Sequence, residues 1–154
     1  MTSMRTTTRL ICLAAFLSLV AWVNQANAQW AVGTTWIRTD DAGKGMTLSI
    51  SACCNGGYRL TYQMPPMGAQ PAMVLTVDSP LDGTDVPALM AGKPSGQSMA
   101  LKRVDDRHYA AVVKFNGQPM MTSTGVVSAD GKTLTVEDVN QGGGTKTVET
   151  WVRK

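Results

Sequence analysis

The chain has few of the side chains on which catalytic and metal centres depend. Its 154 residues include one histidine, His108, and three cysteines. A single histidine excludes a multi-histidine metal site, and the segment Gly92–Gly96 fits neither a nucleophile elbow nor a phosphate loop. The acidic pairs Asp40–Asp41 and Asp105–Asp106 lie where turns are expected, and turns favour aspartate for its local hydrogen bonds. We therefore predict no catalytic residues, no cofactor and no enzymatic activity.

The chain also lacks a surplus of charge of either sign. It has 14 Lys and Arg against 11 Asp and Glu, and two of the basic residues, Arg5 and Arg9, lie in an apparent leader. Without these two the balance is 12 against 11, and the charges are interspersed. A nucleic-acid partner requires a basic surplus, as does an acidic membrane surface, so neither is predicted.

The N-terminal segment has the features of a signal peptide. Arg5 and Arg9 precede an apolar run over Leu10–Val23, and Ala26-Asn27-Ala28 provides small residues for cleavage before Gln29. The run is shorter than the roughly 20 residues of a transmembrane helix, and Ile11 before Cys12 does not fit a lipobox. We predict a signal peptide over 1–28, a single domain over 29–154 without a membrane anchor, and a location in the periplasm or outside the cell.

After the leader, long stretches of helical periodicity are lacking, and period-two alternation recurs between short Gly, Asn, Asp and Pro clusters. Residues 46–52 and 58–64 alternate around Cys53–Gly57, whose Asn and Gly residues suit a tight hairpin turn. Further strands are predicted over residues 73–77, 98–104, 109–115, 119–128, 132–139 and 145–153. The proline- and glycine-rich segment 79–96 is predicted to be a long irregular loop.

These segments predict an all-β domain: a single antiparallel meander of about eight or nine strands. Short connections make neighbouring strands pair antiparallel, and so many strands must either roll into a barrel or split into a β-sandwich. The barrel is our first prediction and the sandwich is the alternative.

Two segments extend this prediction to a family. Gly33-Thr34-Thr35-Trp36 opens the domain and Val127–Thr135 contains an Asp-Gly-Lys turn. Together with the meander they resemble small exported bacterial domains with a lipocalin-like fold. The resemblance implies a calyx-like barrel that holds a small apolar ligand, and it implies that Trp36 closes one end with Arg153 packed on it.

A carrier of this kind needs an apolar lining and an open end, which we expect near the segment 79–96. The inward faces of the predicted strands provide the candidate ligand-binding residues: Leu48, Ile50, Leu60, Tyr62, Leu75, Val113 and Phe115.

Adjacent cysteines are the least ordinary feature of the sequence. Cys53 and Cys54 either form a disulfide with each other, remain as buried thiols, or join two chains into a dimer. Adjacent Cα atoms are only about 3.8 Å apart, which is below the usual disulfide range, so a bond between them would be strained. Export to an oxidising compartment favours the bond over the dimer.

Sulfur chemistry provides an alternative function. Cys53, Cys54, Met64 and Met67 offer soft donors of the kind that select Cu(I), so a copper-binding or thiol-redox protein is the second hypothesis. A competing interpretation places Met64 and Met73 in the core. The third hypothesis is a structural or protein-interaction domain, which would expose a large apolar patch in place of a cavity.

Overall fold

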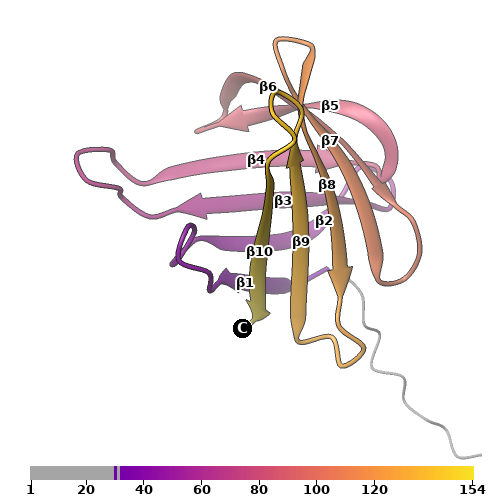
Figure 1. Cartoon of the computed structure of the whole chain (residues 1–154). Coiled ribbons are helices and arrows are strands. Elements are labelled where there is room, and N and C mark those ends of the chain that lie inside the picture. The colour runs from indigo at the N-terminus through magenta and orange to yellow at the C-terminus, as the bar shows by residue number, and fades with distance from the viewer. Residues whose placement is uncertain (1–29, 31) are drawn as a thin grey trace, which may run out of the picture.

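The alternating segments become the strands of one antiparallel barrel (Figure 1). The computed structural model describes Trp30 and residues 32–154, so the predicted leader lies outside the described residues. The strands are β1 (Thr34–Arg38), β2 (Thr47–Cys53), β3 (Gly57–Met64), β4 (Met73–Ser79), β5 (Asp82–Met90), β6 (Lys93–Arg103), β7 (His108–Phe115), β8 (Gln118–Val127), β9 (Thr133–Asn140) and β10 (Lys146–Arg153).

Each strand pairs with its neighbours in sequence, and the first strand pairs with the last. Trp36 of β1 lies opposite Arg153 of β10, which closes the sheet and leaves no open edge. The all-β meander and the barrel are therefore confirmed, and the sandwich alternative was wrong. In the part of the chain described, no helix is long and apolar enough to cross a membrane.

The predicted loop over 79–96 was wrong, because it contains β5 and the start of β6. Pro87 pairs with Ser98 and Pro94 pairs with Leu89, with register shifts between Asp82 and Asp85 and after Pro87. Prolines and glycines at such irregularities bend a strand without ending it. The turn-forming composition of this segment therefore marks a bent hairpin.

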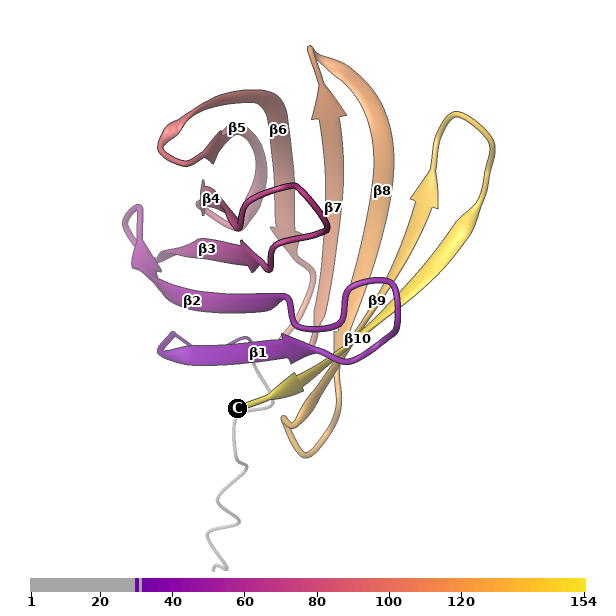
Figure 2. The same ribbon diagram turned by 90° about the vertical axis from the view of Figure 1, so that its left-hand side faces the viewer.

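That bent hairpin joins two differently oriented halves of the barrel. Strands β1 to β4 run crosswise to β7 to β10, and β5 and β6 curve between them (Figure 1). A quarter turn shows the same arrangement, with β1 to β3 crosswise and β7 and β8 upright (Figure 2). Register shifts at strand bends are the usual way in which one sheet turns such a corner.

The core fills the end of the barrel at which the described chain begins, here called the Trp30 end. Trp30 stacks on Tyr109 with ring centroids 4.5 Å apart, and its backbone N–H donates to the Tyr109 hydroxyl. The largest fully buried side chains are Trp36, Trp151, Leu48, Ile50, Leu60, Leu134, Val77 and Val127. Burial of this apolar surface is the main stabilising contribution to the fold.

The pairing of tryptophan and arginine across the closure differs from the one implied by the lipocalin resemblance. Trp36 is fully buried, but its partner in register, Arg153, is exposed. The guanidinium that lies over an indole is that of Arg38, 5.9 Å from the centre of the Trp151 ring. The first strand thus contributes the arginine and the last strand contributes the tryptophan.

Candidate functional site

The barrel encloses a cavity of about 240 Å³. Its wall is mostly apolar and includes Trp30, Leu48, Tyr62, Leu75, Met99, Leu101, Tyr109, Ala111, Val113, Leu134, Val136 and Trp151. Met120 also lines the cavity and is 39% exposed, so the cavity reaches the surface at the end opposite Trp30, here called the rim. A cavity of 150 Å³ with an apolar lining holds benzene, so this one has room for roughly ten non-hydrogen atoms.

Four of the seven predicted ligand-binding residues line this cavity: Leu48, Tyr62, Leu75 and Val113. Ile50 and Leu60 do not line it. They are 2% and 0% exposed and belong to the packed core toward the Trp30 end. Alternation identified their inward face correctly, but it carries no information on how far along the barrel the packing is complete.

Phe115 was also predicted to line the cavity, and the structure places it elsewhere. It is the last residue of β7, is 48% exposed, and lies over Gly96 of β6, where an added Cβ would approach the ring within 3.2 Å. Phe115 therefore covers a strand glycine at the rim, next to the register shift between Val113 and Lys114 that interrupts the alternation of β7 against β8.

Methionines gather where the cavity approaches the rim. Met46, Met64, Met99, Met120 and Met121 all line it. Sequence reasoning considered only Met64 among these, and it considered Met64 as a copper ligand or a core residue. Thioether side chains are flexible and polarisable, so this part of the wall can adapt to differently shaped apolar molecules.

Sequence reasoning also missed a partly buried charged cluster beside the cavity. Arg38 donates from Nε to Asp40 at 2.7 Å and from Nη1 to Glu149 at 2.5 Å. Its side chain is 11% exposed. Glu149 accepts a second hydrogen bond from the indole of Trp151 at 3.0 Å, and Glu149 lines the cavity.

Burial and charge move the pKa values of these two carboxyls in opposite directions. Burial raises the pKa of Glu149; Arg38 opposes this rise, and the negative charge of Asp138 adds to it. The hydrogen bond from Arg38 lowers the pKa of Asp40 to about 2, with further help from the backbone N–H of Thr150. The same burial raises the pKa of the Tyr62 hydroxyl, which therefore stays neutral.

Asp138 is a second carboxyl in the cavity wall and is 6% exposed. One of its oxygens accepts from the Ser123 hydroxyl at 2.5 Å. Within the described chain its other oxygen has no hydrogen-bond partner. The alternation of Leu134, Val136 and Asp138 along β9 is the sequence signal for this inward-facing acid.

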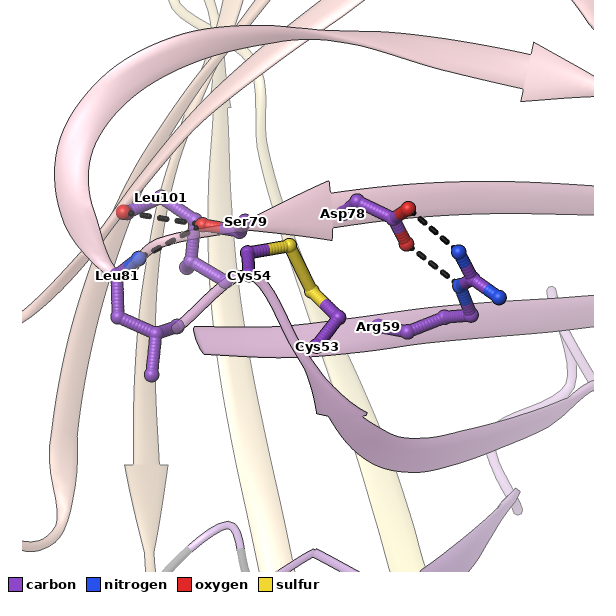
Figure 3. The surroundings of a disulfide bond; sticks show 7 residues. All are labelled: Cys53, Cys54, Arg59, Asp78, Ser79, Leu81 and Leu101. Carbon is purple, nitrogen blue, oxygen red and sulfur yellow. Dashed lines mark hydrogen bonds and ion pairs between the residues drawn. A yellow bond between two sulfur atoms is a disulfide. The ribbon is translucent and has the colours of Figure 1, made fainter. Parts of the chain in front are cut away.

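The adjacent cysteines form a disulfide with each other, at the β2–β3 turn (Figure 3). With both sulfurs bonded to each other, neither bridges a second chain. A carboxylate oxygen of Asp78 and the two sulfurs all lie within 4.8 Å of one another, but Asp78 accepts two hydrogen bonds from Arg59, both at 2.7 Å. In this state the group contains no thiolate to bind a metal.

The structure does not bring the predicted copper ligands together. The disulfide lies at one end of β3 and Met64 at the other, roughly 20 Å away along the strand. Met67 lies beyond Met64 in the β3–β4 connection and is 66% exposed. The four sulfur donors named from the sequence therefore do not form one site.

His108 lies outside the cavity wall, at the start of β7. Its Nδ1 is 2.7 Å from the Asp105 carboxylate, whose pKa is lowered to about 2 by backbone N–H donation from Arg107 and by His108. This arrangement stabilises the β6–β7 turn, as was predicted for the aspartates there.

Comparison with family models, with curated proteins and with solved structures gave no match.

Proposed function

We propose that this protein is an exported, non-enzymatic binding module that holds a small, largely apolar ligand inside its lipocalin-like barrel. The observation that carries the proposal is the cavity of about 240 Å³, which is lined by aliphatic, aromatic and thioether side chains and reaches the surface at the rim. Concave, mostly apolar cavities with a few polar groups are the common form of a small-molecule site.

The proposed location is the periplasm or the extracellular space. The leader-like segment 1–28 supports export, and the Cys53–Cys54 disulfide fits an oxidising compartment. The copper alternative loses its support, because its sulfur donors lie at opposite ends of β3.

Titration with n-propylbenzene tests the carrier proposal. This neutral molecule has nine non-hydrogen atoms and matches the size of the cavity. Trp30 and Trp151 line the cavity, so we expect binding to change the tryptophan fluorescence, with saturation at one molecule per chain. No saturable change, together with no heat of binding in calorimetry, would refute the proposal.

A blocking variant makes the test specific to the cavity. Ala111→Phe places a large ring into the lined space and is expected to abolish binding. Val112→Phe is the matched control, since alternation directs the next side chain of β7 to the other face. Equal binding by both variants would place the ligand outside the barrel.

A further inference from the structure

The charged residues at the cavity lie together on one side of the barrel. Ser123, Asp138, Glu149 and Arg38 belong to β8, β9, β10 and β1, which are consecutive in the closed sheet. Ser123 lies directly opposite Asp138 in register. Glu149 lies opposite Val136, two residues from Asp138 on the same face, which is the spacing of diagonal cross-strand neighbours.

The facing wall is mostly apolar and carries no charge, and Gln97 of β6 is its polar residue besides the tyrosines. Its residues come from β2, β3, β4, β6 and β7 and include Leu48, Tyr62, Leu75, Met99 and Val113. A ligand inside this cavity thus meets carboxylates on one side and hydrocarbon, thioether and aromatic surface on the other. A ligand that matches both walls is amphipathic.

The charges on the polar side are unbalanced. Glu149 is repelled by both Asp40 and Asp138, and Arg38 is the base that attracts all three acids. Arg38 donates to Asp40 and Glu149 and reaches Asp138 only through longer-range attraction, so the hydrogen-bond partner of Asp138 in the described chain is the Ser123 hydroxyl. Burying such a carboxylate is costly unless a cation or further donors satisfy it.

We propose that the ligand is a small organic cation, with an ammonium group bound at Asp138 and an apolar body of about ten non-hydrogen atoms against the facing wall. This inference rests on the proposed carrier function and specifies its ligand class. The ammonium supplies the donor that Asp138 lacks and offsets the negative excess. The Tyr62 and Trp151 rings, which meet edge-on at 6.2 Å, line the same space and favour a cation near their faces.

The test compares 2-phenylethylamine with n-propylbenzene, which has the same number of non-hydrogen atoms and no charge. At pH 7 the amine is protonated. The ratio of the two dissociation constants therefore measures how much the carboxylate side of the cavity contributes to binding the ammonium group. A hydrogen bond between charged groups contributes enough to tighten binding by about tenfold to a hundredfold. Calorimetry on the wild-type protein is expected to show an advantage of that size for the amine.

Asp138→Asn tests the residue itself while keeping an acceptor for Ser123. It is expected to remove the advantage of the amine and to leave n-propylbenzene binding unchanged. Glu137→Gln is the control: it removes the same charge from the adjacent residue, which pairs with Lys146 and is 46% exposed. This variant is expected to keep the advantage. Near-UV circular dichroism checks that both variants are folded.

The outcomes separate the two proposals. If n-propylbenzene binds the wild type as tightly as the amine does, the ligand class is wrong and the carrier function stands. If Glu137→Gln lowers amine binding as much as Asp138→Asn does, the effect is general electrostatics and Asp138 is not the anchor. If neither molecule binds the wild type, the carrier function itself is refuted. The wild-type comparison decides the ligand class even if Asp138→Asn does not fold.

Discussion

Replacing Arg38 with methionine tests whether the partly buried cluster of Arg38, Asp40 and Glu149 stabilises the contact of β1 with β10. The variant keeps much of the apolar stem and removes the cation that pairs with Asp40 and Glu149. Breaking a buried ion pair by removing one partner costs about 3–5 kcal/mol, because the remaining charges stay buried. Both acids are 20% exposed, so we expect the lower part of this range, about 3 kcal/mol at pH 7.

The stability difference between the wild type and Arg38→Met is expected to become smaller as the pH falls from 7 to 4. In the wild type the pKa of Asp40 is about 2, below its unfolded value, so its stabilising contribution is present at neutral pH and is lost as the pH falls toward 2. In the variant the pKa of Glu149, already raised by burial, rises further without Arg38. Protonation of Glu149 then relieves its burial cost. Between pH 7 and pH 4 the Glu149 effect brings the stabilities of the two proteins closer together, and the Asp40 contribution is lost only at lower pH, below its unfolded pKa of 3.8.

Urea unfolding at pH 7 and pH 4, followed by tryptophan fluorescence, measures these differences. Arg59→Met is the matched control, since Arg59 also donates two hydrogen bonds to a carboxylate, but its side chain is 51% exposed. Exposed pairs contribute at most about 1 kcal/mol. Equal losses in the two variants, or a loss at Arg38 that does not shrink in acid, would refute the assigned role of the cluster.

Two further predictions concern the Trp30 end. Gly57→Ala is expected to destabilise the fold by about 2–4 kcal/mol in urea unfolding, because its Cβ would come within 2.2 Å of the Ser79 carbonyl oxygen, whereas Gly142→Ala makes only ordinary contacts and serves as the control. The double variant Cys53→Ser, Cys54→Ser is expected to change stability by less than about 1 kcal/mol, since a bond between adjacent residues closes almost no loop; a larger loss would show that the bond organises the hairpin.

Most strands could be predicted because their sequence repeats the two-residue period of a half-buried sheet. Segments such as Thr47–Cys53 and Gly57–Met64 alternate clearly and are joined by an Asn-Gly turn. The strand Asp82–Met90 could not be found in this way, because its register shifts interrupt the alternation and place proline and glycine inside it. Composition alone does not distinguish a bent strand from a loop.

The candidate site was predicted only in part, for a different reason. The alternation that identified Leu48 and Tyr62 also places Asp138 and Glu149 on inward faces. These two acids were not predicted to line the cavity, because an apolar side chain is the usual mark of an inward position. Their inward position became meaningful only when β8, β9, β10 and β1 were found side by side. That neighbourhood joins the first strand to the last, and the sequence alone does not state which acid pairs with which base across it.

The distribution of side-chain size explains why the barrel is hollow on one side and filled on the other. A ten-strand barrel has a wider interior than an eight-strand one, so it is filled only where large side chains face inward. Toward the Trp30 end they are large, as with Trp36 and the stacked Trp30 and Tyr109. Farther along, Ala111 lies opposite Ser123, and neither fills the space between the walls. The cavity therefore follows from small residues at paired positions of β7 and β8, and enlarging Ala111 is the most direct way to close it.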